Sequence, residues 1–240
     1  MVSLLLLHCW LCLRFYNDRM KRFAAGYEFF ARIIMMILVT HIAFLVHTLL
    51  GLIIVGLHPS IAATYGTYRA WALDVKDRHW TVKRMWMTFH NLWKSELKKA
   101  NLLGWPITLI WALLIWEYWL TQTNYMGQVG YAVSGFLLLL NFLFGLFALL
   151  VWVIEQNFSE SLWWDVKMAA QMSIARPVCS IFLILILIVT VWLYWKLPGL
   201  AIALGISLPV YLIVMVVYAF GRLQGMDVHV LEPHTKRSKK

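Results

Sequence analysis

Charged residues are scarce in this chain: they make up 13% of its 240 residues, whereas 62% are hydrophobic. A soluble domain has about 25% charged and about 45–50% apolar residues, so an ordinary soluble fold is excluded. Segments of alternating polar and apolar residues, typical of a transmembrane β-barrel, are also missing. The remaining class is an all-α integral membrane protein, since helices satisfy their own backbone hydrogen bonds in lipid.

Motifs that would indicate an enzyme are absent as well. We find no phosphate-binding glycine loop, nucleophile elbow, zinc motif or paired mid-membrane carboxylates. Three cysteines cannot form a closed disulfide framework and fit a reduced cytoplasmic setting. Cys9 and Cys12 do form a C-x-x-C pair beside His8, but no second ligand pair lies nearby, which disfavours a metal or redox site. We therefore expect a non-enzyme without a cofactor or metal.

The net charge of +10 does not indicate nucleic-acid binding, because the basic residues flank hydrophobic segments rather than forming one polar domain. Cytoplasmic flanks of membrane spans are rich in Lys and Arg, and such flanks attract anionic lipid. The 14 Trp and 10 Tyr residues fit interfacial belts at the ends of spans. We therefore expect the anionic inner leaflet of a cell membrane as a partner, and no nucleic acid.

Five apolar segments approach or exceed the about 20 residues needed to cross a bilayer. They are residues 31–56, 102–121, 130–154, 178–196 and 199–221. The link between 121 and 130 has no charge and the link at 196–199 has only Lys196, so both are expected outside; the stretches 77–101 and 155–177 and both termini are then cytoplasmic. An even number of spans is then required, so a sixth must lie between residues 56 and 77.

The stretch 59–76 is the candidate for the sixth span, although a re-entrant hairpin stays open. Pro59 suits the first turn of a returning helix, where its missing N–H costs nothing. The following residues to Lys76 would span about 27 Å. Small residues including Ser60 and Gly66 predict close packing against neighbouring helices, and Arg69 can extend toward the headgroups. The sequence therefore predicts about six spans with both termini cytoplasmic.

Two cytoplasmic amphipathic helices are predicted, at 79–101 and 157–177. The first has apolar residues at spacings of three and four, with Lys and Arg mostly on the other side. It is predicted to lie on the inner leaflet or to bind a protein partner. Its expected lipid or partner contacts are Trp80, Met85, Trp86, Phe89, Trp93, Lys94 and Lys98. The second helix is predicted to start at a Ser159 N-cap and to stop at Pro177.

The predicted organisation is a cytoplasmic lead (1–30), one membrane domain (31–221) and a basic cytoplasmic tail (222–240). The "MKRF" motif at Met20 resembles a natural start, so residues 1–19 are open to interpretation as a start-site artefact.

Few polar groups lie within the predicted spans. His41 and His47 are most simply satisfied interior histidines, and Asn141 is placed to form an interhelical hydrogen bond. Glu117 lies close enough to the outer end of its span to reach water. Pro209 is expected to kink the last span.

The stretch "GLHPSIAATYGTYRAW", followed by "MWMTFHNLWKSELKKANLLGW", resembles the YesL-like family of bacterial integral membrane proteins, whose biochemical function is unknown. The matching residues are Pro59, Ala62, Ala63, Arg69, Trp86, Phe89, Asn91, Trp93 and Lys94. The likeness extends over about residues 20–220 but is specific only within 56–106. His58 departs from the family, which usually has glycine there, and this raises the question of whether the turn uses a positive φ.

The resemblance implies an accessory role in carbohydrate uptake, because members of the family tend to be encoded with carbohydrate-degrading enzymes and ATP-driven sugar importers. The permease subunits of such an ABC importer are the implied partners. The alternative is a small-solute or ion transporter that uses His41, Asn141 and Glu117. The family has no established functional residues to carry over.

Overall fold

The computed structural model describes residues 2–74, 77, 79–124 and 127–221, with side chains from residue 26 onward. All regular secondary structure in these ranges is helical, which confirms the predicted all-α fold. The helices are α1 (Val2–Leu50), α2 (Leu57–Leu73), α3 (Val82–Thr123), α4 (Gly127–Asn157), α5 (Leu162–Ala175), α6 (Pro177–Lys196), α7 (Pro198–Leu204) and α8 (Ser207–Phe220).

Four helices are long and apolar enough to cross a membrane: α1 over Gly26–Leu50, α3, α4 and α6. The bent pair α7–α8 makes a fifth if it is counted as one span. α2 has 17 residues and is not among these candidates. The structure therefore supports a membrane protein with several spanning helices, while the count of six stays a prediction.

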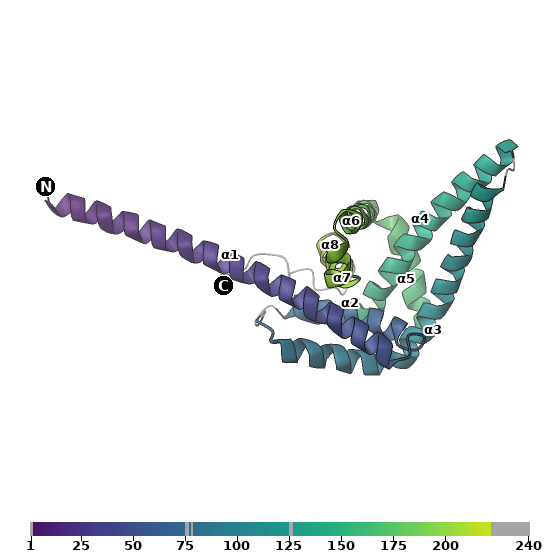
Figure 1. Cartoon of the computed structure of the whole chain (residues 1–240), viewed down its shortest axis with the longest axis horizontal. Helices are drawn as coiled ribbons and strands as arrows, with labels where there is room; N and C mark the ends of the chain where they lie inside the picture. The colour runs from purple at the N-terminus through teal and green to yellow at the C-terminus, as the bar shows by residue number, and fades with distance from the viewer. Residues whose placement is uncertain (1, 75–76, 78, 125–126, 222–240) are drawn as a thin grey trace, which may run out of the picture.

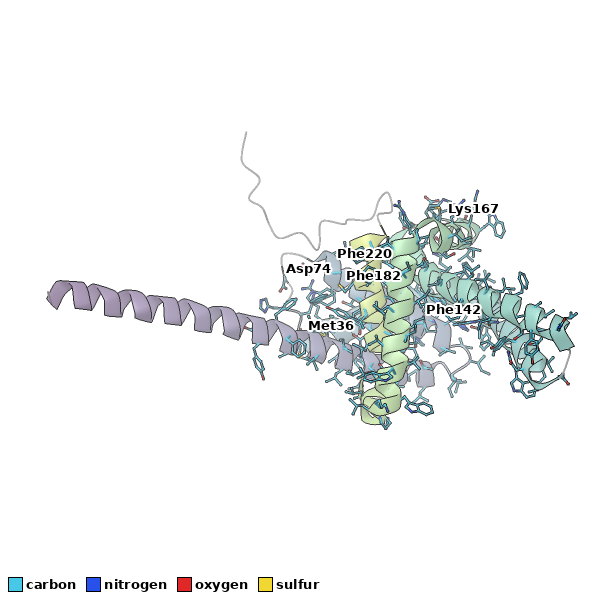
Figure 2. The ribbon with its side chains drawn as sticks, turned by 90° about the horizontal axis from the view of Figure 1, so that it is seen from above. Met36, Asp74, Phe142, Lys167, Phe182 and Phe220 are labelled. Atoms are coloured by element: carbon cyan, nitrogen blue, oxygen red, sulfur yellow. The ribbon has the colours of Figure 1, made fainter. Side chains whose placement is uncertain are left out.

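The helices run in different directions rather than forming one bundle of near-parallel helices. α1, α2 and the first part of α3 lie side by side, and α1 extends far beyond the others toward its N-terminus (Figure 1). The second part of α3 pairs with α4 in a hairpin that points away from them. α6 and α8 are seen end-on in Figure 1 and lengthwise in Figure 2, so they cross the first three helices steeply.

α2 is the most enclosed helix, and its small side chains explain why. Ser60, Ala62 and Ala63 are completely buried, and Gly66 lies close to Gln156 of α4, whose Oε1 would be 2.3 Å from an added Cβ. Small residues let neighbouring backbones approach closely, so the packing predicted for this stretch is confirmed. Pro59 lies in the first turn of α2, which begins two residues earlier than predicted.

The predicted cytoplasmic helix 79–101 and the predicted span 102–121 are parts of one helix, α3. Thr81 caps its start by accepting a hydrogen bond from the backbone N–H of Arg84 at 3.3 Å. Pro106 lies inside the helix and lacks the N–H that would bond to the carbonyl one turn earlier. Kinks are nearly always found at such positions, and α3 does change direction along its length (Figure 1).

Two predicted helix boundaries need correction. α5 is capped by Ser161, which accepts from the Trp164 N–H, rather than by Ser159, because the chain stays extended for two further residues. The expected kink at Pro209 lies earlier, at Gly205, whose φ of +36° is available to glycine. α7 and α8 meet there with a bend of 72°. Pro177 does separate α5 from α6, as predicted, and is the first residue of α6.

The proposed boundary at residue 30 falls inside the continuous helix α1, so the lead and the first span are not separate elements. The side chains of Cys9 and Cys12, and the whole predicted tail at 222–240, lie outside the described residues.

Candidate functional site

The aromatic side of the 79–101 segment faces the inside of the fold. Trp80, Met85 and Phe89 are 4%, 2% and 1% exposed. Trp86 and Trp93 are half-buried, with ring centroids 5.4 and 5.3 Å from that of His47. α3 lies beside α1 and α2, and burying its apolar stripe there removes that area from the surface.

The predicted contact surface on this segment is corrected accordingly. Its three most buried members, Trp80, Met85 and Phe89, cannot reach a partner or a lipid unless the fold opens. Lys94 and Lys98 are exposed on the opposite side of the helix, as predicted.

His47 is a satisfied interior histidine. Its Nδ1 lies 2.8 Å from the Ala43 carbonyl oxygen and its Nε2 lies 3.1 Å from His90 Nδ1. If His47 Nδ1–H donates to that carbonyl, then Nε2 accepts and His90 Nδ1–H is the donor. The pair therefore connects α1 to α3, which is a structural role.

The three polar residues considered for transport do not converge. His41 is buried on α1, with its Nε2 3.2 Å from the Ile202 carbonyl oxygen in α7. Asn141 contacts α3 instead, and Glu117 is exposed on that helix. The structure thus places the three residues in separate environments.

His58 occupies space that a glycine in α3 leaves free. Its Nε2 lies 2.9 Å from Thr108 Oγ1, and a Cβ added at Gly104 would come within 2.0 Å of His58 Cδ2. His58 is helical, whereas the left-handed residues of the preceding turn are Leu52 and Ile53, with φ of +52° and +64°. The departure from the family glycine therefore does not require positive φ at position 58.

This contact gives a first testable result. We expect Gly104→Ala to destabilise the protein by about 1–3 kcal/mol, because the new methyl group must displace the His58 ring. The thermal unfolding of the purified chain measures the effect. His58→Gly should restore much of the loss in the double variant, and an additive double variant would contradict the packing. Gly135→Ala is the matched control, since nothing lies within 4 Å of its added Cβ.

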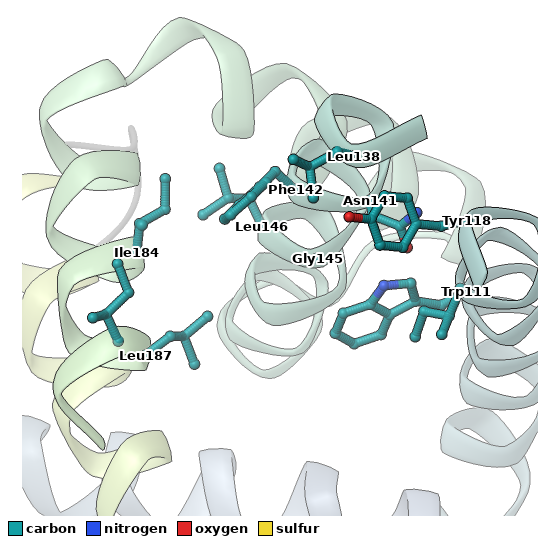
Figure 3. Close-up of a pocket in the computed structure, with 11 residues that line it drawn as sticks. Trp111, Tyr118, Leu138, Asn141, Phe142, Gly145, Leu146, Ile184 and Leu187 are labelled. Carbon is teal, nitrogen blue, oxygen red and sulfur yellow. The ribbon is translucent and has the colours of Figure 1, made fainter. Parts of the chain in front are cut away.

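An apolar groove of about 330 Å³ separates the α3–α4 hairpin from α6. We call it the intramembrane groove. Its lining residues are Trp111, Ile115 and Tyr118 of α3, Leu138, Asn141, Phe142, Gly145 and Leu146 of α4, and Ile184, Leu187 and Ile188 of α6. Figure 3 shows Trp111, Tyr118 and Asn141 on one side and Ile184 and Leu187 on the other. The groove is bounded by three candidate membrane spans.

Asn141 gives the groove its main polar feature. Its Nδ2 donates to the Leu114 carbonyl at 3.1 Å and to the Leu137 carbonyl at 2.9 Å, which ties α4 to α3 as predicted. Its Oδ1 is buried and accepts no hydrogen bond from the described residues. A buried carbonyl oxygen without a donor is unfavourable, so Asn141 holds an unused acceptor that a donor reaches when the side chains around it shift.

A second, polar pocket of about 450 Å³ lies where α2, α3 and α4 meet. We call it the charged pocket. It is lined by Arg69, Leu92, Glu96, Lys99, Glu155, Gln156, Asn157, Phe158, Ser159 and Glu160. Lys99 Nζ lies 3.0 Å from Glu155 Oε1 and 3.6 Å from Asp165 Oδ2 in α5. Both carboxylate side chains are fully buried, so this lysine joins three helices through buried charge.

Burial raises the pKa of Asp165, while the Lys99 ammonium group opposes that rise. Neither carboxylate oxygen of Asp165 accepts a hydrogen bond within the part of the chain that the structure describes. Keeping Asp165 ionised in this site therefore depends on Lys99.

Sequence reasoning missed this cluster. Glu96 and Lys99 are neighbours in α3, whereas Glu155 and Asp165 follow much later in the chain, near the end of α4 and the start of α5. Only the crossing of α3, α4 and α5 brings them together. The sequence instead predicted 79–101 as a surface helix, on which Glu96 and Lys99 would be solvated.

The geometry does not form a metal centre. Among the described residues, no group of three or more His, Cys, Asp or Glu side chains is arranged to hold an ion. Cationic and anionic side chains both line the charged pocket, so it suits a polar or charged ligand. The intramembrane groove suits an apolar partner that carries a hydrogen-bond donor.

Comparison with known proteins finds a similarity to a family of unknown function. Residues 37–118, which run from the middle of α1 through most of α3, match the family described as "Protein of unknown function, DUF624", which is the YesL-like family. The "Uncharacterized protein YteU" of Bacillus subtilis (strain 168) is 27% identical over 211 residues, covering 86% of this chain and 89% of YteU. No solved structure matches the chain. Both matches agree with the resemblance to the YesL-like family that was drawn from the sequence.

Proposed function

We propose that this protein is a non-enzymatic membrane protein that assists carbohydrate uptake by binding the membrane subunits of an ABC importer. The family resemblance supplies the link to sugar import. The intramembrane groove supplies a place where side chains of a partner's transmembrane helix fit. The proposal locates both termini in the cytoplasm and the contact within the membrane, rather than on the aromatic side of 79–101.

The unused Oδ1 of Asn141 is the observation that carries this proposal. Helices associate in membranes through close packing and interhelical hydrogen bonds, because lipid provides no hydrophobic drive between them. The groove presents apolar walls for packing and one unused acceptor, Asn141 Oδ1. A partner helix with a Ser, Thr, Asn or Gln side chain would supply the missing hydrogen-bond donor.

Asn141→Leu tests the contact. It removes the acceptor while keeping the side-chain volume, so we expect partner binding to weaken by about 0.6–2 kcal/mol, or about 3-fold to 30-fold. Co-purification of the importer in mild detergent measures this. Leu139→Met is the matched control, because Leu139 is 58% exposed on the same helix but does not line the groove.

Uptake measurements test the biological role. Deletion of the gene should reduce uptake of the importer's sugar, and Asn141→Leu should reduce it partly. Unchanged uptake after deletion, with the importer expressed at its normal level, would contradict the proposed function.

The six-span topology is a separate part of the proposal. The turn between α1 and α2 is apolar and exposed, with Leu52 82% exposed. Such a turn also suits a re-entrant hairpin, which is the alternative to six spans. In a chain whose native cysteines are replaced by serine, Leu52→Cys and Lys83→Cys should react with a membrane-impermeant maleimide from opposite sides of sealed cells. Labelling of both from the same side would contradict six spans.

The alternative function, transport of a small solute or ion by the protein alone, requires flux without a partner. Reconstitution of the purified chain in liposomes separates the two functions. We expect no sugar or ion flux from the chain alone, whereas a transporter would show it.

A further inference from the structure

The charged pocket is acidic in a strongly basic protein. The chain has 21 Lys and Arg residues against 11 Asp and Glu residues. Around this pocket the balance is reversed: three glutamates line it and Asp165 adjoins it, against two cations, Arg69 and Lys99. This local excess of carboxylates favours a cationic ligand.

The carboxylates around the pocket are short of hydrogen-bond donors. Glu155 is 96% buried and lines the pocket; its Oε2 accepts from Gln156 Nε2 at 2.6 Å, and its Oε1 lies 3.0 Å from Lys99 Nζ. Glu96 Oε2 is buried without a well-formed hydrogen bond among the described residues, and the Glu96 carboxyl lies close to the side chains of Glu155 and Gln156. Buried carboxylate oxygens are stabilised by charged donors. Glu96, Glu155 and Asp165 thus share one ammonium group, that of Lys99, so a ligand with N–H donors would find carboxylate acceptors here.

The contacts of Lys99 show that an ammonium group is a suitable donor for these carboxylates. Its ammonium group already lies against Glu155 and Asp165, within 3.0 and 3.6 Å of their oxygens. Glu96 is on the same helix, three residues earlier, and its Oε2 lacks a well-formed hydrogen bond among the described residues. A second ammonium group placed against Glu96 and Glu155 would supply up to three N–H donors and neutralise one carboxylate.

We propose that the charged pocket binds a small ligand that carries a primary ammonium group, held by Glu96 and Glu155. The pocket volume of about 450 Å³ is large enough for a small organic amine. Arg69, whose Nε donates to Asn157 Oδ1 at 3.0 Å, lies in the wall of the same pocket. It provides a cation for a phosphate if the amine belongs to a phosphoethanolamine group. This site is separate from the intramembrane groove and does not depend on the proposed function.

Binding is tested with ethanolamine hydrochloride on the full chain in detergent. Ethylene glycol with equimolar sodium chloride is the matched control, because it has nearly the same size but no ammonium group. Ethanolamine should raise the melting temperature in a saturable manner, and the control mixture should not. An equal response to both solutions, or no saturable response to ethanolamine, would overturn the proposal.

Variants locate the site. Glu96→Gln should raise the dissociation constant for ethanolamine at least tenfold, whereas Glu117→Gln, exposed elsewhere on α3, should leave it unchanged. Glu160→Gln, at an exposed edge of the pocket, should raise it a few-fold and provides a readout if Glu96→Gln does not fold. Unchanged affinity in both Glu96→Gln and Glu160→Gln would overturn the assignment to this pocket.

The ammonium group can come from a soluble amine or from the headgroup of phosphatidylethanolamine. Nanodiscs of phosphatidylethanolamine and of phosphatidylcholine distinguish these sources, since choline has no N–H donor. If the lipid supplies the group, the phosphatidylethanolamine discs should raise the melting temperature and abolish the further effect of ethanolamine. If a soluble amine supplies it, ethanolamine should act equally in both kinds of disc. Both results support the ammonium site, and the absence of any ethanolamine or lipid effect would contradict it.

Discussion

Replacing Lys99 with methionine should lower the free energy of unfolding by about 3–5 kcal/mol, because removing one partner of a buried ion pair leaves the other charge uncompensated. Here two fully buried carboxylates, on Glu155 and Asp165, would lose their common ammonium partner. Methionine keeps the length and apolar volume of the side chain, so the loss reports on charge. Reversible unfolding in mixed micelles measures it.

The pH dependence of this variant provides its internal check. A carboxyl whose folded pKa lies above the unfolded value stabilises the fold fully below the unfolded pKa, and this contribution is lost as pH rises through the folded pKa. Burial already raises the pKa of Asp165, and loss of Lys99 should raise it further. The loss in free energy of unfolding caused by Lys99→Met should therefore be smaller near pH 4 and larger near pH 8. A deficit that is the same at both pH values, or equal to that of the exposed control Lys94→Met, would contradict the buried-charge account.

The second large effect is expected at the break between α7 and α8. Gly205→Ala should destabilise the protein by about 2–4 kcal/mol, since it combines a strained backbone with a steric clash. Gly205 has a φ of +36°, and an added Cβ would lie 2.0 Å from His41 Cε1. The shift in thermal unfolding measures the combined cost.

Gly199→Ala is the control for this variant, because it lies in the adjoining helix and nothing lies within 4 Å of its added Cβ. It should be neutral or slightly stabilising. Adding His41→Ala to Gly205→Ala should relieve the clash but leave the backbone strain, so the rescue is expected to be partial. A Gly205→Ala protein as stable as Gly199→Ala would show that the break is not held in this geometry.

The helical class and the small-residue packing of α2 could be predicted from the sequence, because they depend on local composition. The small side chains of Ser60, Ala62 and Ala63 predict close packing, and all three are completely buried. The role of Pro177 at the start of α6 was likewise a local property of one residue.

The direction of the α3 apolar stripe could not be predicted in the same way. Periodicity shows that Met85 and Phe89 share a face, but not whether that face meets lipid, a partner or another helix of the same chain. The structure places it against α1 and α2, where both side chains are buried. The position of this helix at the inner leaflet stays a prediction, but tertiary packing buries Met85 and Phe89 of the stripe.

The charged pocket depends on contacts between residues far apart in the sequence. Lys99 and Asp165 are separated by the whole α3–α4 hairpin, so neither local charge pattern nor hydropathy indicates their pairing. The sequence likewise predicts a kink at Pro209 rather than the break at Gly205. A proline in the first turn of a helix causes no strain, and only the backbone geometry shows that α8 begins at Ser207.

Photo-crosslinking inside the intramembrane groove tests most directly whether that groove receives a partner helix. A benzoylphenylalanine at Phe142, which is half-exposed and lines the groove, should form an adduct with a membrane subunit of an ABC importer in native membranes. The same probe at Leu139, outside the groove, should not form that adduct. No protein adduct at Phe142, or the same adduct at both positions, would contradict the account.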